Sequence, residues 1–329
     1  MLFSFSIALC QTNGDSHYHN EDVTFYNDKI QLQGQLYIPN GTGPFPTVIF
    51  THGSGDSGID NKRYKLEAEY FAKHGILSFV YDKRGYGKSS GDWHHADYQD
   101  LANDAVAAVN LLKDHKHVDA SRIGLRGISQ SGWVLPIVAQ LSKEVDFIIL
   151  ISPPGVTTYE QILYDVRTDV EDLGFKPNEV QSAMEVIKSG MYYAKTLNNW
   201  DRHQRILDKY KDAKWINAAS GPPIADHWLW SWVNPVLDFD AVPLVAETEA
   251  SILIILGEKD RVIPSQIAGY RFNHELKQRG GKYNIVYFKN AGHDLRIADL
   301  DPNQGEPPLV EGYLELMKNW IIKSTLDKS

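Results

Sequence analysis

Cysteine is almost absent from this chain, because Cys10 is the one cysteine among 329 residues. A single thiol excludes an intramolecular disulfide and a cluster of thiolates around a metal ion. Basic residues are also scarce, since 33 Lys and Arg against 42 Asp and Glu give a net charge of −9. A protein that binds the phosphate backbone of nucleic acid is normally basic. We therefore expect neither a nucleic-acid partner nor a thiolate metal centre.

Long apolar runs are scarce as well. No segment approaches the roughly 20 apolar residues of a transmembrane helix, so we predict no membrane span. Residues 1–10, MLFSFSIALC, resemble the hydrophobic region of a secretory signal peptide, with a cut expected ahead of Gln11. We therefore predict a signal segment at residues 1–10 and a secreted or periplasmic protein. If this run is instead a short buried strand, the protein is cytoplasmic.

The rest of the chain has the composition of a globular protein, with 43% hydrophobic and 23% charged residues. Short apolar runs at residues 47–50, 76–81 and 147–151 have the length of buried strands. Helical patterns at residues 62–74 and 97–114 alternate with them. This alternation predicts a doubly wound α/β sheet, mostly parallel, with the first two strands as an antiparallel edge.

The alternation stops at Pro153. Residues 153–250 have helical patterns without strand signals, and a strand pattern returns only at Ile252. A segment of this length is too long for a loop. We predict a helical lid at residues 153–250, inserted into a core that residues 11–152 and 251–329 form.

A glycine-rich loop, Gly-Ser-Gly-Asp-Ser-Gly, lies at residues 53–58 after the first buried strand. It has the form of a dinucleotide-binding fingerprint, in which main-chain amides hold a pyrophosphate and an acid such as Asp82 holds a ribose. The next helix begins only after Asp60, so the glycines do not open it. This disfavours the dinucleotide hypothesis, and leaves a flexible turn or an oxyanion-binding loop as alternatives.

The segment around Ser129 has the pattern of a nucleophile elbow, Gly127-Ile-Ser-Gln-Ser131, between a strand and a helix. A serine on such a tight turn raises its hydroxyl above the sheet, and small residues two positions either side relieve crowding. Gly127 and Ser131 are both small, although glycine is more usual at the second position. We predict that Ser129 is a nucleophile.

A serine hydroxyl needs a base, and the base needs an acid that orients it. Asp260 follows the strand pattern at residues 251–256, and His293 follows the pattern that ends near Phe288. The ends of parallel strands meet at one edge of a sheet, so both should lie near the Ser129 turn. We predict Asp260 as the acid, with Glu258 as the alternative, and His293 as the base.

Two main-chain N–H groups are needed to stabilise the oxyanion of such a reaction. One comes from the residue after the nucleophile, which is Gln130. The other comes from the loop after the first buried strand, where we predict Ser54, with Gly53 as the alternative.

Five segments together resemble the α/β-hydrolase superfamily, and in particular its bacterial serine esterase and peptidase-like branch: His52–Gly55, Asp82–Ser89, Gly127–Trp133, Gly257–Asp260 and Gly292–His293. The resemblance implies an α/β-hydrolase fold, the same triad, and structural roles for Asp82 and Arg84.

We therefore expect a serine hydrolase that cleaves carboxylic esters of small molecules through an acyl-enzyme intermediate, without a cofactor. The same triad serves thioesterases, acyltransferases and peptidases, which remain alternatives. A ligand-binding module without activity and a dinucleotide-dependent oxidoreductase are alternatives from other classes. The sequence leaves the oligomeric state and the acyl chain length open.

Two further patterns invite a functional interpretation. Histidines occur in pairs without acids at a fixed spacing, so we expect surface residues and no metal site: His17 and His19, His94 and His95, His115 and His117.

Three tryptophans, Trp228, Trp230 and Trp232, precede the strand that leads to Asp260. We predict that they line an acyl pocket, on one side of the chain if the segment is extended. Packing of the lid onto the core is the alternative.

Overall fold

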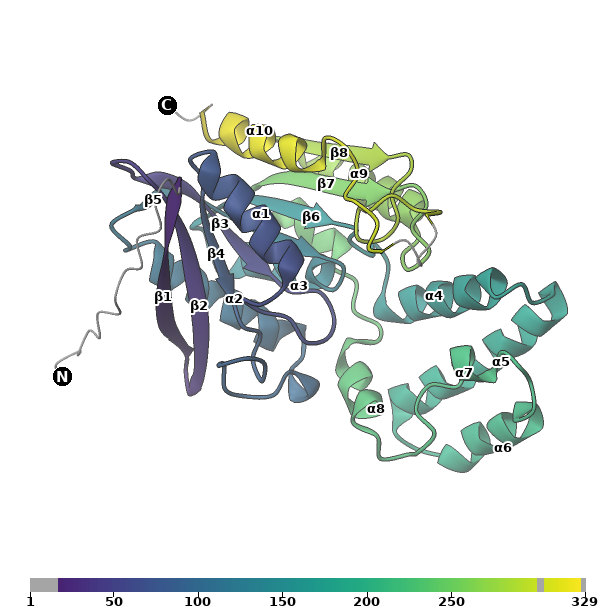
Figure 1. Cartoon of the computed structure of the whole chain (residues 1–329). Coiled ribbons are helices and arrows are strands. Elements are labelled where there is room, and N and C mark those ends of the chain that lie inside the picture. Colours follow the sequence, from purple (N-terminus) through teal and green to yellow (C-terminus); the bar gives the residue numbers. More distant parts are fainter. Residues whose placement is uncertain (1–16, 301–304, 327–329) are drawn as a thin grey trace.

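The computed structural model describes residues 17–300 and 305–326, so the predicted signal segment lies outside the described residues. An eight-stranded sheet forms the centre of the molecule, in the order β1-β2-β4-β3-β5-β6-β7-β8 (Figure 1). The strands are β1 (Tyr18–Asn27), β2 (Ile30–Pro39), β3 (Phe45–Thr51), β4 (Leu77–Tyr81), β5 (Val118–Ile128), β6 (Val145–Ile151), β7 (Ser251–Gly257) and β8 (Tyr283–Phe288). β1 and β2 pair antiparallel, as do β2 and β4, whereas all the other pairs are parallel. This confirms the predicted α/β class and its antiparallel edge.

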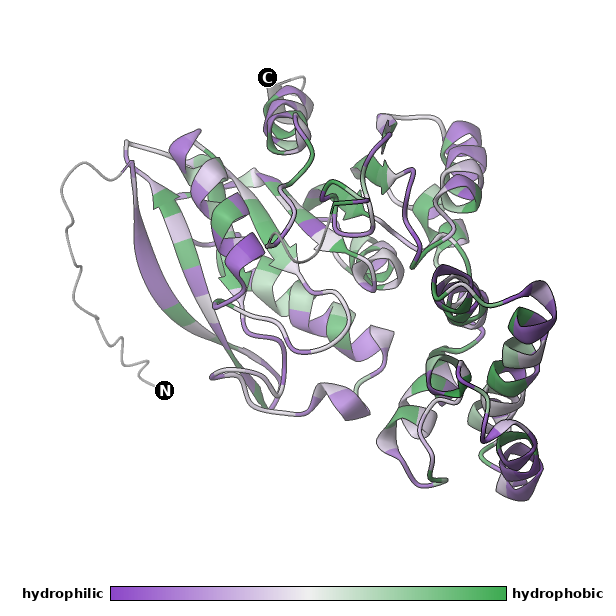
Figure 2. Cartoon of the chain, turned by 45° about the vertical axis from the view of Figure 1, so that its right-hand side comes forward, coloured by the Kyte–Doolittle hydropathy of each residue, from purple (hydrophilic) through white to green (hydrophobic). Residues whose placement is uncertain are grey.

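Helices cover both faces of the sheet. One face packs against α1 (Lys62–Lys73) and α10 (Tyr313–Leu326), through buried side chains such as Phe71 and Tyr313. The other face packs against α2 (Tyr98–Leu112), α3 (Ser131–Leu141) and α9 (Ser265–Arg279). Hydrophobic residues are concentrated on the strands and on the helix faces that meet them (Figure 2). Each face of the sheet therefore has its own hydrophobic core, and the strand ends remain at the edges.

A set of helices joins β6 to β7, and we call residues 152–250 the insertion. Its helices are α4 (Thr158–Asp172), α5 (Pro177–Thr196), α6 (Trp200–Tyr210), α7 (Ile216–Ala219) and α8 (Trp228–Val233), followed by short 3₁₀ turns at Asn234–Val236 and Val242–Glu247. Another 3₁₀ turn, Trp93–His95, precedes α2 in the body of the protein. Buried residues of α5, α7 and α8, including Met184 and Trp230, form a third core inside the insertion. The insertion projects from the body beside the sheet (Figure 1).

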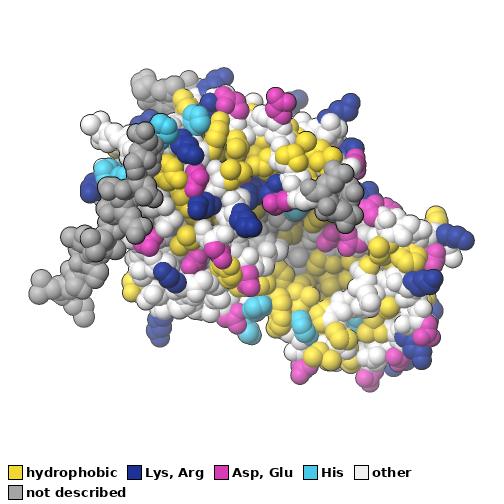
Figure 3. All heavy atoms as spheres, viewed as in Figure 1, with side chains coloured by type: hydrophobic (Ala, Val, Ile, Leu, Met, Phe, Trp, Pro, Cys, Tyr) yellow, Lys and Arg dark blue, Asp and Glu magenta, His cyan; other side chains and the backbone are white. Residues whose placement is uncertain are grey.

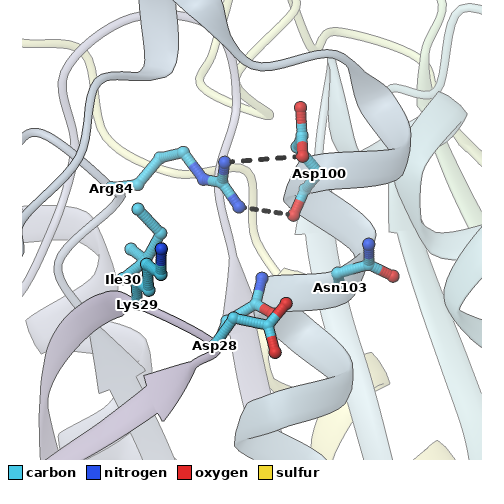
Figure 4. Close-up of a pocket in the computed structure, with 7 residues that line it drawn as sticks. Asp28, Lys29, Ile30, Arg84, Asp100 and Asn103 are labelled. Atoms are coloured by element: carbon cyan, nitrogen blue, oxygen red, sulfur yellow. Dashed lines mark hydrogen bonds and ion pairs between the residues drawn. The ribbon is translucent and has the colours of Figure 1, made fainter.

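The segment after β4 is held by its own charged residues. The Asp82 carboxylate accepts hydrogen bonds from the main-chain N–H groups of Ile59 and Lys88, both at 2.9 Å. Arg84 donates twice to the Asp104 carboxylate, at 2.7 and 2.8 Å. It also contacts Asp100, beside a shallow pocket at the β1–β2 turn (Figure 4). Both residues thus anchor loops, which agrees with the structural roles expected of them.

Candidate active site

Ser129 lies on the turn between β5 and α3 with a φ of +54°, in the left-handed region that few residues other than glycine adopt. Gly127 permits this turn, because a Cβ atom there would come within 2.3 Å of the Ser131 Cβ and 2.4 Å of the Thr51 Oγ1. The Ser129 side chain is only half-buried. The backbone thus has the strained strand-to-helix geometry that exposes a nucleophilic serine.

Ser131 has a different role. Its side chain is fully buried, and its hydroxyl donates to the His52 carbonyl at 2.6 Å and lies 3.0 Å from the Thr51 hydroxyl. Both of its neighbours belong to the end of β3 and the loop that follows. Ser131 therefore ties the loop after β3 to the first turn of α3.

His293 and Asp260 are brought together in the loops after β8 and β7. The His293 Nδ1 lies 2.8 Å from the Asp260 Oδ2, and the Asp260 side chain is fully buried. The other carboxylate oxygen accepts from the main-chain N–H groups of Val262 at 2.8 Å and Ile263 at 2.9 Å. A carboxylate fixed in this way can hold the imidazole in one tautomer and orientation. The alternative acid, Glu258, is exposed.

Ser152 connects the serine turn to the histidine loop. The Ser129 N–H donates to the carbonyl of Ile151 at 2.9 Å, and Ile151 ends β6. The next residue, Ser152, donates its hydroxyl to the His293 carbonyl at 2.6 Å and its N–H to the Ile255 carbonyl at 2.8 Å. The structure thus brings Ser129, Asp260 and His293 to the same edge of the sheet, at the carboxyl ends of parallel strands.

The glycine-rich loop lies against the Ser129 turn. A Cβ built on Gly53 would be 3.9 Å from the Ser129 Cβ. In the described part of the chain, the main-chain N–H groups of Ser54 and Gln130 donate no hydrogen bond to another protein atom. His52, at the start of the loop, is buried, and its Nε2 lies 2.7 Å from the Tyr81 carbonyl. Burial lowers the pKa of His52 to about 3, so it cannot serve as a base at neutral pH.

A buried charge cluster lies beneath this edge of the sheet. Glu67 of α1 accepts hydrogen bonds from Arg126 of β5 at 2.7 Å, from Arg63 at 2.8 Å and from the Tyr313 hydroxyl at 3.0 Å. Burial alone would raise the pKa of Glu67, but the two guanidinium groups hold it below its ordinary value. Arg63 also donates to the carbonyl of Asp294, the residue after His293, at 2.5 Å. Hydropathy patterns assign charged residues to the surface, so this cluster could not be predicted from the sequence.

Helix α4 of the insertion packs on the loop that carries the acid. The Tyr164 hydroxyl donates to the Asp260 carbonyl at 3.2 Å, and the Gln161 amide donates to the Val262 carbonyl at 3.0 Å. Asp165 lies on the same helix, where burial, together with the charge of Asp169, raises its pKa to about 6. Figure 3 shows hydrophobic side chains along the hollow between the body and the insertion.

The three tryptophans do not lie on one side of an extended segment, because Trp228–Val233 is the helix α8. Trp230 is 1% exposed and packs inside the insertion against Trp200 and Tyr193, so the prediction that it lines a pocket is wrong. Trp228 and Trp232 are four residues apart on the opposite helix face. Their rings lie 5.4 and 6.5 Å from that of Trp93 in the body. The Trp232 Nε1 also donates to the Ala96 carbonyl at 3.1 Å, so both side chains join the insertion to the body.

The paired histidines have protein partners. His94 and His95 each contact the Asp92 carboxylate through Nδ1 at 2.8 Å. Within residues 17–300 and 305–326, no group of three or more His, Cys, Asp or Glu has the arrangement of a metal site. Over the same residues, no helix is long and apolar enough to cross a bilayer.

Comparisons with known proteins place this geometry in a family. A family model described as serine aminopeptidase, S33 matches residues 42–299. The chain is similar to the esterase EstD of Thermotoga maritima, with 31% identity over 162 residues, 48% of this chain and 38% of that protein. It is also similar to a thiohydrolase of Aspergillus aculeatus, with 30% identity over 159 residues, 46% of this chain and 49% of that protein. Each alignment thus spans less than half the length of the relative.

The fold has solved counterparts. An esterase structure from Pyrococcus furiosus superimposes with a TM-score of 0.59 and 17% identity, over 98% of this chain and 96% of that chain. At this identity the likeness concerns the fold alone.

Proposed function

Since this chain belongs to the α/β-hydrolase superfamily, in the family described as serine aminopeptidase, S33, we propose that it is a serine hydrolase that cleaves carboxylic esters of small molecules. The hydrogen bond between His293 and Asp260, at the sheet edge that holds the Ser129 turn, is the observation that carries the proposal. An imidazole oriented by a buried carboxylate is the base that a serine nucleophile requires.

In the proposed reaction, the Ser129 hydroxyl attacks the ester carbonyl while the His293 Nε2 takes its proton. The resulting oxyanion accepts hydrogen bonds from the N–H groups of Ser54 and Gln130, and Asp260 stabilises the imidazolium. His293 then protonates the departing alcohol, which leaves an acyl group on Ser129. Water that gives a proton to His293 attacks this acyl-enzyme, and the acid departs as Ser129 recovers its proton.

An ester is favoured as substrate because one relative carries the name esterase, while the name thiohydrolase of another keeps a thioester as an alternative. The family description supports a peptidase as the second candidate, since the same groups can cleave an amide. A dinucleotide-dependent reaction has little support, because α1 begins at Lys62 with Asn61 as its cap and the loop glycines lie outside the helix. Export of the protein remains a prediction from residues 1–10.

The test combines covalent labelling with turnover. The purified protein is treated with a fluorophosphonate probe and assayed on p-nitrophenyl esters of increasing chain length and on aminoacyl p-nitroanilides. We expect labelling of the wild type and of Ser121→Ala, an exposed serine variant, and faster ester than anilide cleavage. Ser129→Ala should lose labelling and several orders of magnitude in kcat. An unlabelled, inactive wild type would contradict the proposal, and faster anilide cleavage would favour the peptidase.

A further inference from the structure

Lys83 is the most unusual charged residue near the candidate site. It lies two residues after β4 and is 1% exposed, although lysine is almost never fully buried. Its ammonium donates three hydrogen bonds, to the carbonyls of Gly53 at 3.1 Å and Gly55 at 3.2 Å and to the Gln130 Oε1 at 3.0 Å. An ammonium has three donors, so all of them are used. None of the three acceptors carries a formal charge.

The three acceptors belong to the two halves of the proposed oxyanion hole. Gly53 and Gly55 flank Ser54, the first N–H donor, and Gln130 is the second. In a trans peptide the C=O and the following N–H point in opposite directions. When Lys83 holds the Gly53 carbonyl, the N–H of Ser54 must point away from the ammonium. The buried Lys83 side chain thus orients the N–H of Ser54, and it is hydrogen-bonded to the side chain of Gln130, whose N–H is the second donor.

We propose that Lys83 is a positioning residue that assembles the oxyanion hole and supplies it with a buried positive charge. This inference rests on the proposed hydrolase function. A fixed positive charge behind two main-chain donors favours an oxyanion more than a neutral carbonyl, so it acts in the transition state rather than on the bound substrate. Removal of Lys83 should therefore lower kcat far more than it changes KM.

The protonation state of Lys83 gives a second readout. Burial lowers the pKa of Lys83 to about 7, against a small opposing effect of Asp56. Three other ionisable side chains line the same small cavity: His52 is neutral in this range, burial raises the pKa of Tyr81 well above its ordinary value, and Asp104 is paired with Arg84. A neutral amine has two donors, so one of the three acceptors loses its partner above this pH. We expect kcat/KM to fall on the alkaline side with an apparent pKa of about 7.

The experiment compares Lys83→Met and Lys83→Arg with Lys88→Met, a matched control whose side chain is exposed in the same segment. On p-nitrophenyl acetate we expect Lys83→Met to lose about 10²-fold in kcat, with KM within about threefold of wild type. Affinity for an aryl trifluoromethyl ketone, whose serine adduct carries an oxyanion, should fall by a similar factor. The Lys83→Arg variant stays charged, so its kcat/KM should no longer fall at alkaline pH. The Lys88→Met variant should match the wild type in kcat, KM and pH profile.

Two results would overturn the role of Lys83. One is a folded Lys83→Met variant with kcat within about threefold of the wild type. The other is a Lys83→Arg variant whose kcat/KM falls at alkaline pH as in the wild type. This second result decides the matter even if Lys83→Met does not fold. A wild type that is neither labelled nor active would refute the hydrolase function itself. An active wild type with Ser129-dependent labelling and an unaffected Lys83→Met variant would refute only the present inference.

Discussion

Glu67→Gln tests whether the buried charge cluster under the active-site edge stabilises the fold. The side chains of Glu67 and Arg126 are both 0% exposed, and the carboxylate is bonded to two guanidinium groups and a tyrosine hydroxyl. Glutamine keeps the shape but removes the charge, so Arg126 would remain buried without a counter-ion. Breaking a buried pair from one side typically costs about 3–5 kcal/mol of folding free energy.

The expected shift in melting temperature follows from chain length. Unfolding entropy of about 2.1 cal/mol/K per residue gives about 0.7 kcal/mol/K for 329 residues. Glu67→Gln should therefore lower Tm by about 4–7 °C at neutral pH. The matched control is Glu69→Gln on the same helix, whose partner Lys65 is 4.0 Å away and 61% exposed. The Glu69 side chain is 26% exposed and its partner is exposed, and such a surface pair contributes about 0–1 kcal/mol, so the control should shift Tm by about 1 °C or less.

The pH dependence gives the sign of the effect. Because the folded state holds the pKa of Glu67 below its ordinary value, its contribution is fully present above the unfolded pKa of about 4.3. This contribution to the free energy of unfolding is lost as the pH falls through the lower pKa that Glu67 has in the folded state. The difference between wild type and Glu67→Gln should hence shrink below about pH 4, as differential scanning calorimetry can measure. Equal Tm values for Glu67→Gln and Glu69→Gln at pH 7 would refute this reasoning.

Three further predictions concern the site and the insertion. Ser131→Ala leaves the buried His52 carbonyl without its donor, so Tm should fall by about 1.5–4 °C in thermal melts while labelling by a fluorophosphonate persists. Trp230→Ala should lower Tm without altering the ratio of kcat/KM between short and medium acyl esters, whereas Trp228→Ala should lower Tm less and alter that ratio by about threefold or more. Asp165 has a folded pKa of about 6, above its ordinary value, so its ionised form destabilises the fold. Asp165→Asn should therefore raise Tm at pH 8 but not at pH 4, and an equal shift at both would contradict this assignment.

The layers of the fold could be predicted because they follow from local periodicity. Apolar runs of about four to six residues alternate with amphipathic segments, and Ser129, Asp260 and His293 each follow the end of a strand pattern. In the structure, α2 begins with a capping box, in which the Asp97 and Asp100 side chains each accept a hydrogen bond from the other's main-chain N–H. These features need no knowledge of distant contacts.

Features that depend on distant partners could not be predicted. Lys83 is bonded to residues 30 and 47 positions away, and nothing in its neighbours distinguishes it from an exposed lysine. The tryptophan segment alternates like a strand, but the His227 ring caps a helix by accepting from the Leu229 N–H at 3.2 Å. The packing of Trp230 inside the insertion therefore favours a helix here, although the alternating sequence pattern favours a strand.

The position of the insertion has a consequence for how such a protein can change. β6 and β7 are hydrogen-bonded neighbours, paired from Phe147 with Ser251 to Ile151 with Ile255. The chain therefore leaves the sheet and returns to the adjacent strand, and the insertion closes its own core between those two points. Evolution or engineering could exchange the helices of this unit, because they pack around a core of their own and the register of β6 and β7 does not depend on them. Substrate preference could then diverge rapidly among descendants while the serine, histidine and aspartate stay in place.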